Sequence, residues 1–419
     1  MRYLAIFVGT VGVMFPVLAL TVRGAANTCF FLVALSGLVA IGCRYKSSGK
    51  HFSQVLREYW PINLAFTGIF LAVLSNLISS GTFETRHLDS PLRFALFALV
   101  FWTLLLTPVK SEKYLEWGLI VGSLFTSLKT YYLWHKGAGR DQMGDFITII
   151  SFADMAMLLG VFVAFSIGWN DKKDKAIIAF KLVVMLASLY AVYISESRGA
   201  WIAIPVFATI ALSLVKVRKS YKIVISLLII FILGGVLSYG EIGKQRIKNI
   251  KSDIAAYVDG TNPDTAVGLR FQMWHGSWVL FTEHPLLGTG RQFYADGLKE
   301  LSSLGIISPE AAKTGQGHSH QEVLYYMAAY GIIGLLALLL TYFVPAYYFF
   351  RELSGQDQRI RCAAGMGLAL CLGFFVYGLT HVQFLWTHCS VFYSFYAALF
   401  LAYIVKRKES LHNSALLPV

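Results

Sequence analysis

The chain has 419 residues, of which 56% are hydrophobic and only 14% are charged, and its formal net charge is +13. The apolar residues occur in blocks about twenty long instead of at the spacing of amphipathic surface helices, which excludes an ordinary water-soluble domain. The positive charge requires no nucleic-acid partner, because Lys and Arg in loops between apolar blocks indicate membrane topology and contact with anionic lipid. We therefore predict an all-α integral membrane protein.

The apolar blocks predict about twelve transmembrane helices. In chain order they are expected at 4–21, 26–43, 61–80, 91–108, 114–133, 146–169, 176–195, 200–215, 222–240, 321–350, 361–380 and 384–405. The loops between them alternate in charge. The segments after even-numbered blocks hold nineteen Lys or Arg, whereas the short loops after odd-numbered blocks hold five. Because short cytoplasmic loops retain positive charge, both termini are expected in the cytoplasm.

This alternation divides the chain into four parts. Residues 1–240 are expected to form nine transmembrane helices, and residues 321–405 the last three, followed by a cytoplasmic tail at 406–419. Between them, residues 241–320 are polar and far longer than a usual helix connection, which indicates a functional loop on the extracytoplasmic side.

The long loop contains its own amphipathic segment. In GLRFQMWHGSWVLFTEHP, aromatic residues recur at steps of three and four, which predicts a helix with one aromatic face that could rest on the bilayer surface. Arg270 lies at the edge of that face, where it could meet lipid headgroups or a substrate phosphate. After the helix, a Gly-rich turn and Arg291 bring backbone amides and a guanidinium close together, as in an anion site.

Arg198 lies in YISESRGAWIAIP, between two apolar helices that have almost no loop between them. A guanidinium at this depth usually faces a partner or a water-filled cavity. Two hypotheses remain open: an ion pair with Glu196 that closes the turn, or a cation that awaits an anionic ligand.

His318 and His320 stand in the polar segment directly before the apolar block at 321–350. At a helix N-terminus the dipole disfavours the imidazolium, and a neutral imidazole is what a general base requires. An H-x-H pair could also bind metal, but no Cys or carboxylate stands beside it at ligand spacing, so we predict no metal site. A purely structural role as polar helix caps is the remaining alternative.

The motif that begins at residues 320–321 is specific. His and Gln are followed by nine residues and then by Gly331 and Gly334, which resembles the pattern of O-antigen ligases: His, one of Asn, Ser or Gln, nine residues, G-x-x-G. The SRGAW step at 197–201 and the stretch at 268–290 resemble the wider superfamily of O-antigen ligases and polymerases. We expect the two glycines to let a neighbouring helix pack closely and so to hold the histidine-bearing end.

The resemblance implies a GT-C-like glycosyltransferase in the inner membrane of a Gram-negative bacterium, with its active site facing the periplasm. Its donor would be an O-antigen polysaccharide on undecaprenyl diphosphate, and its acceptor a sugar hydroxyl of lipid A–core. The diphosphate is itself a good leaving group, so no cofactor, nucleotide or metal is expected.

Roles follow for the candidate residues. His320 is expected to be the general base, while Arg198 and Arg270 stabilise the charge on the leaving diphosphate. Lower-ranked candidates for substrate binding are Arg291, His318 and Gln321.

Three alternatives differ in chemistry. An O-antigen polymerase shares the donor and the topology but adds the chain to another lipid-linked repeat. A protein O-oligosaccharyltransferase is disfavoured, because no soluble C-terminal region is evident. A flippase performs no covalent chemistry and would line a path through both leaflets with ionisable residues, whereas here these residues gather on one side.

Overall fold

The computed structural model describes residues 2–47, 49–82, 84–107, 112–170, 174–215 and 241–415. Within these ranges the chain is helical, apart from turns, loops and one isolated bridge between Ser47 and Lys50, which confirms the all-α prediction. The helices are α1 (Arg2–Leu18), α2 (Ala25–Gly42), α3 (Phe52–Glu58), α4 (Trp60–Ser79), α5 (Asp89–Ala95), α6 (Phe97–Leu104), α7 (Glu112–His135), α8 (Ile149–Phe165), α9 (Lys175–Ile194), α10 (Ile204–Leu214), α12 (Glu241–Val258), α13 (Ala266–Glu283), α14 (Arg291–Ser303), α15 (Pro309–Gly315), α16 (Glu322–Glu352), α17 (Gln358–Gly378) and α18 (Thr387–Ala415). Two 3-10 turns matter below, η1 (Thr85–Leu88) and η5 (Arg198–Ala203).

Seven helices among the described residues are long and apolar enough to cross a membrane: α2, α4, α8, α9, α16, α17 and α18. The chain is thus a multi-pass membrane protein. α1 and the joined η5–α10 segment are apolar but shorter, and the block expected at 91–108 is divided into α5 and α6. The block at 222–240 lies outside the described residues. The count of about twelve spans therefore stays a prediction.

The helices differ in how far they are buried. In α8, α17 and α18, 83% of the apolar window is buried inside the protein, against 33% in α9, so the first three form the centre of the bundle and α9 its edge. α16 packs against α4 and α17, and α18 packs against α17, α5 and α6. α18 continues to Ala415, so most of the expected tail at 406–419 is helical.

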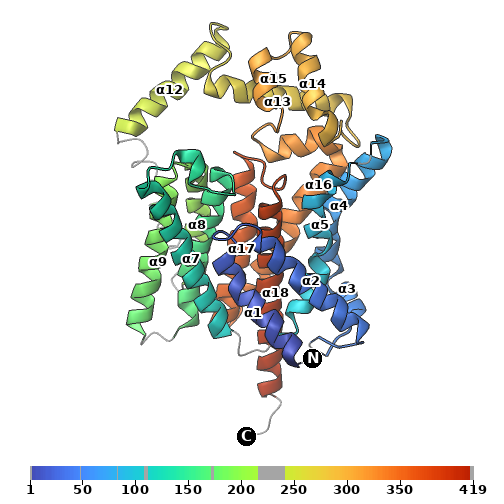
Figure 1. Ribbon diagram of the computed structural model, residues 1–419, viewed down its shortest axis with the longest axis vertical. Helices are drawn as coiled ribbons and strands as arrows, with labels where there is room; N and C mark the ends of the chain where they lie inside the picture. The colour runs from blue at the N-terminus through green and yellow to red at the C-terminus, as the bar shows by residue number, and fades with distance from the viewer. Residues whose placement is uncertain are drawn as a thin grey trace.

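The polar segment 241–320 folds into four helices, α12 to α15, at one end of the bundle (Figure 1). Both termini lie at the opposite end. The expected amphipathic helix is present as α13, which begins at Ala266 because the Thr265 hydroxyl caps it by accepting a hydrogen bond from the Gly268 N–H. Its buried face carries Gln272, Met273 and Leu280, whereas Trp278 is exposed and the other residues of the aromatic stripe are partly buried.

Candidate functional site

The histidine segment forms a short loop between α15 and α16. Gln321 is the N-cap of α16, and its side-chain oxygen accepts the Leu324 N–H at 2.5 Å, which confirms that His320 directly precedes the helix. Trp274 of α13 donates its indole N–H to the Ser319 carbonyl at 3.1 Å. The loop is therefore held from two sides, by α16, which follows it, and by α13.

His320 has a left-handed backbone, with φ of 55°. Such a conformation is uncommon for a residue with a side chain and occurs often at functional sites. The His320 backbone N–H donates to His318 Nδ1 at 3.2 Å, so the first histidine supports the unusual conformation of the second. Because Gln321 is occupied as a cap, its part in substrate binding stays a prediction.

A third histidine, which the sequence motif did not include, lies beside this pair. His381, in the loop between α17 and α18, has its ring centroid 5.0 Å from that of His318 and 6.1 Å from that of His320. One ring nitrogen from each of the three residues lies within 4.8 Å of the others. We call His318, His320 and His381 the histidine cluster.

Burial keeps the histidine cluster neutral. Burial, and then the neighbouring His320, lower the pKa of His318 to about 4. Burial, followed by His318, His320, His388 and Arg270, lowers the pKa of His381 to about 3. Burial, followed by the charge of Arg270, also lowers the pKa of His320. A neutral ring keeps one lone pair, so His320 is able to accept a proton at neutral pH, and its role as the general base stays a prediction.

The same effects locate Arg270. Its charge acts on His320 and on His381, so the guanidinium lies near the cluster, while the residue itself is exposed. Arg198 is also exposed and begins η5. A Cβ on the next residue, Gly199, would lie 2.9 Å from the Thr380 hydroxyl, so η5 packs against the residue that precedes His381. The Arg270 guanidinium thus lies near the histidine cluster, and the backbone next to Arg198 packs against the loop that carries His381.

One of the two hypotheses for Arg198 is an ion pair with Glu196, and no such pair is found in the described part of the chain. Glu196 instead turns the chain by a left-handed conformation, with φ of 56°, and its N–H donates to the Tyr193 carbonyl at 3.1 Å. The turn is closed by the backbone, which leaves the guanidinium available for an anion.

Arg291 lies elsewhere. Its charge contributes, after burial, to the lowered pKa of His87 in η1, and the neighbouring Gln292 donates to Ser80 and Thr82 beyond the end of α4. The Gly-rich turn before it is not the anion site we expected. The N–H groups of Thr289 and Gly290 donate to carbonyls of α16 at 2.9 Å, and the Gly288 N–H donates to His284. A substrate role for Arg291 stays a prediction.

The two motif glycines act differently from the expected helix contact. α16 is interrupted at Gly331, with φ of 63° and ψ of −157°, and a Cβ there would lie 2.3 Å from the Leu286 carbonyl oxygen. The neighbouring Ile332 N–H bonds the Pro285 carbonyl at 2.8 Å. The missing side chain of Gly331 therefore lets the loop before α14, and not a neighbouring helix, pack closely against α16. At Gly334 the close contact is with Tyr330 of α16 itself.

Replacing Gly331 with alanine is expected to destabilise the protein by roughly 2–4 kcal/mol, because the new Cβ is strained at positive φ and meets backbone that cannot rotate away. Thermal unfolding of the detergent-solubilised protein measures this. Gly139→Ala is the matched control, since its Cβ would meet nothing within 4 Å and its φ is −62°. Equal melting temperatures for the two variants would contradict the close approach.

Glu322 is a second residue that the sequence analysis passed over. Its carboxylate is buried in the first turn of α16, where Oε1 accepts the Phe384 N–H at 2.7 Å and Oε2 accepts the Tyr342 hydroxyl. A carboxylate at the start of an apolar helix is a recognisable signal, since buried charge requires partners. Here it ties the His320 end of α16 to the loop that carries His381.

Three histidines with clustered nitrogens are also a possible metal-ligand set. The hydrogen bonds argue against that use. His318 Nδ1 accepts the His320 N–H, and His381 Nε2 accepts the Trp386 indole N–H at 3.2 Å. The remaining nitrogen of each neutral ring therefore carries a hydrogen and offers no lone pair to a cation. The donor set suits a hydrogen-bonding ligand better than a metal ion.

Comparison with known proteins agrees with this site. A family model described as O-antigen ligase matches residues 182–339. Over this segment the chain is similar to O-antigen ligases. It contains η5, α13 and the start of α16, and thus the two arginines and the first two histidines of the site. The match confirms the resemblance for this segment and supports a relation to the superfamily of O-antigen ligases and polymerases.

One similar protein comes from Haemophilus influenzae, where it is described as uncharacterized. It is 27% identical over 338 residues, which cover 79% of this chain and 83% of the relative. The similarity thus extends well beyond the O-antigen ligase segment. His381 lies outside that segment, so the family match does not include the third histidine.

Proposed function

We propose that the protein is an O-antigen ligase, which transfers a polysaccharide from undecaprenyl diphosphate to a sugar hydroxyl of lipid A–core. The observation that carries the proposal is a neutral, left-handed His320 beside the exposed charge of Arg270, at the start of the helix with the family motif. A base for a hydroxyl and a cation for a diphosphate are the two groups that this transfer requires.

The reaction is a single displacement. His320 takes the proton of the acceptor hydroxyl, the oxygen forms a bond to the anomeric carbon, and the bond from that carbon to the diphosphate breaks. The electron pair leaves with undecaprenyl diphosphate, whose charge Arg270 and Arg198 stabilise with planar, bidentate guanidinium groups. Inversion at the anomeric carbon follows from attack opposite the leaving group.

The site is proposed to face the periplasm of a Gram-negative inner membrane, with both termini in the cytoplasm. The excess of Lys and Arg in the segments after even-numbered apolar blocks supports this orientation. The position of α12 to α15 at the end opposite both termini is compatible with it (Figure 1). The exposed Trp278 of α13 suits contact with the outer leaflet, because Trp side chains favour the membrane interface.

The test is reconstitution of the purified protein in liposomes with lipid-linked glycan and lipid A–core, with the product separated on a gel. Ligase activity moves label onto lipid A–core. If the label instead enters longer lipid-linked chains when lipid A–core is withheld, and never reaches lipid A–core, the protein is a polymerase of the same superfamily. Movement of donor across the bilayer without any new glycosidic bond would indicate a flippase.

Transfer is expected to proceed unchanged in EDTA and without nucleotide triphosphate. The arginines neutralise the diphosphate, and the hydrogen bonds of His318 and His381 use the lone pairs that a metal would need. Initial rates with and without the chelator measure this. A loss of product that returns when a divalent ion is added would contradict metal independence.

A further inference from the structure

His381 is held in one orientation and one tautomer. It is buried, and the indole N–H of Trp386 donates to its Nε2 at 3.2 Å with the two rings nearly parallel, at an interplanar angle of 14°. An indole nitrogen only donates, so Nε2 is the acceptor and the hydrogen of the neutral ring lies on Nδ1. His381 therefore presents an N–H donor from a fixed position.

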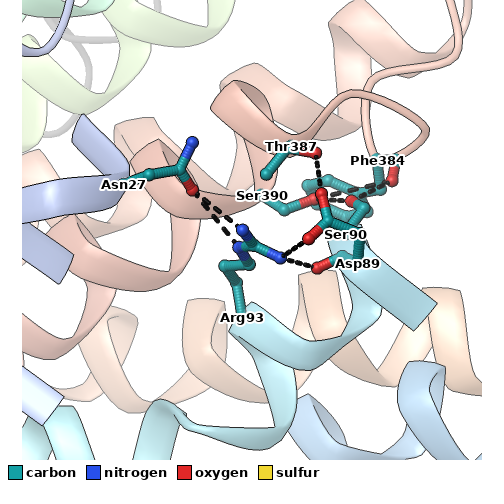
Figure 2. Close-up of polar contacts among 7 residues, drawn as sticks. All are labelled: Asn27, Asp89, Ser90, Arg93, Phe384, Thr387 and Ser390. Carbon is teal, nitrogen blue, oxygen red and sulfur yellow. Dashed lines mark hydrogen bonds and ion pairs between the residues drawn. The ribbon is translucent and has the colours of Figure 1, made fainter. Parts of the chain in front are cut away.

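The loop that carries His381 is anchored on several sides. Phe384 binds Glu322 of α16 through its N–H, and its carbonyl accepts the Ser90 hydroxyl of α5 at 2.7 Å. Figure 2 shows the adjoining contacts, in which Thr387 donates to Asp89, and Asp89 pairs with the buried Arg93. Such supporting contacts are what a preorganised binding group requires.

Two ring nitrogens of the cluster are buried and have no hydrogen-bond partner among the described residues: His381 Nδ1 and His320 Nδ1. The first is a donor by the argument above. The second belongs to the neutral ring that the proposed function uses as a base, so it is free to accept. Buried polar atoms without partners are rare in proteins and indicate a missing ligand when they meet at a site.

A hydroxyl group matches this pair, because it donates one hydrogen bond and accepts others. One ring nitrogen of each residue lies within 4.8 Å of one nitrogen of the other, and the two ring centroids are 6.1 Å apart. Two hydrogen bonds of about 2.8 Å that meet at one oxygen near the tetrahedral angle span about 4.6 Å. The spacing of the two rings is thus compatible with one oxygen atom bound between them.

We propose that His381 is a substrate-binding residue that grips the acceptor hydroxyl together with His320. His381 Nδ1–H donates to the oxygen, and the hydroxyl hydrogen points to His320 Nδ1. The second lone pair of the oxygen is then directed away from both rings, toward the anomeric carbon. The proton passes to His320 when the new bond forms, and His381 exchanges no proton. This inference rests on the proposed function and extends it from the donor to the acceptor.

The experiment measures the acceptor concentration dependence of transfer in the liposome assay. His381→Ala is expected to raise the acceptor KM and to lower kcat, with a combined loss of about tenfold to hundredfold, because it removes one hydrogen bond and the orientation that it provides. Donor binding, measured separately with lipid-linked glycan alone, is expected to stay at the parental level and also reports that the variant is folded.

Two further variants separate hydrogen bonding from packing. His381→Asn is expected to recover part of the loss, since the asparagine amide can place an N–H near the position of Nδ1. Trp386→Phe keeps a flat ring but removes the donor that selects the tautomer, so an intermediate loss is expected. His275→Asn, at an exposed histidine of α13, is the matched control and is expected to be parental.

Parental acceptor kinetics in His381→Ala would overturn the inference, as would a loss confined to donor binding. One equivalent of zinc in the purified parent that disappears in His381→Ala would also overturn it, in favour of a metal site. A parent that labels lipid-linked repeats but not lipid A–core defeats the ligase proposal alone. In that case the same variants are measured with the lipid-linked repeat as the acceptor. Parental acceptor kinetics in His381→Ala would then overturn the role of His381.

Discussion

Replacing His320 with alanine is expected to reduce transfer by about a hundredfold to ten-thousandfold while donor binding survives. The imidazole acts only on the acceptor proton, whereas the arginines and lipid contacts hold the donor. The measurement is donor binding and product formation, determined separately in the same liposomes.

Backbone strain has to be separated from lost chemistry, because His320 has a φ of 55°. Alanine is disfavoured there, but asparagine tolerates the left-handed region and has no basic nitrogen. His320→Asn is therefore expected to fold like the parent and to be equally inactive. His318→Ala is expected to be milder, since that ring supports the His320 backbone N–H. Near-parental transfer by His320→Asn would assign the base to another residue. The same conclusion would follow if His318→Ala were the inactive variant.

The same base predicts a pH dependence. Burial, followed by the Arg270 charge, lowers the pKa of His320 below its usual 6.5, so the ring is neutral at pH 7 and above. A base must be unprotonated, so kcat is expected to be constant near neutral pH and to fall only as the pH drops below 6.5. An acidic limb that persists unchanged in His320→Asn residual activity would contradict this assignment.

Replacing Arg270 with alanine is expected to lower kcat by about a hundredfold to a thousandfold, the usual effect of losing one donor to a developing negative charge. Arg270→Lys is expected to restore little, because an ammonium group cannot reproduce the bidentate geometry of a guanidinium. The pKa of His320 is also expected to rise when the nearby charge is removed, which shifts the acidic limb of the pH profile upward.

Replacing Arg198 with alanine is expected to lower kcat by the same factor as Arg270→Ala, measured in the same liposome assay. Glu196→Gln is the matched control beside it, because the described part of the chain contains no ion pair between the two residues. A fully active lysine variant at either arginine would remove the diphosphate role from that position. A loss in Glu196→Gln as large as in Arg198→Ala would instead indicate a structural turn.

One sequence prediction about the site was wrong. Proximity along the chain indicated that the Gly-rich turn offers its backbone amides to an anion beside Arg291. In the structure the turn amides of Thr289 and Gly290 bond carbonyls of α16, and Arg291 lies beside η1. Composition identifies groups that can bind an anion, but only packing decides whether a backbone N–H is already used.

His381 shows the opposite failure. In the sequence it is a lone histidine in a short loop between two apolar helices, sixty-one positions after His320, and nothing in its local pattern distinguishes it. The structure brings it to His318 because α16 and α17 pack side by side, and because Glu322 binds the backbone of the loop that follows α17. Contacts of this kind depend on tertiary packing and leave no periodic signal.

By itself, the sequence determined that the protein is helical and lies in a membrane, since long apolar blocks have no other means of satisfying their backbone in lipid. It also located His320 at the start of a helix and Arg270 on an amphipathic helix, because capping and periodicity are local properties. Only the tertiary structure decided that α13 lies over the histidine loop through Trp274, that Gly331 admits a loop, and that three histidines share one site. These depend on the distance between segments far apart in the chain, which side-chain packing sets and local sequence does not.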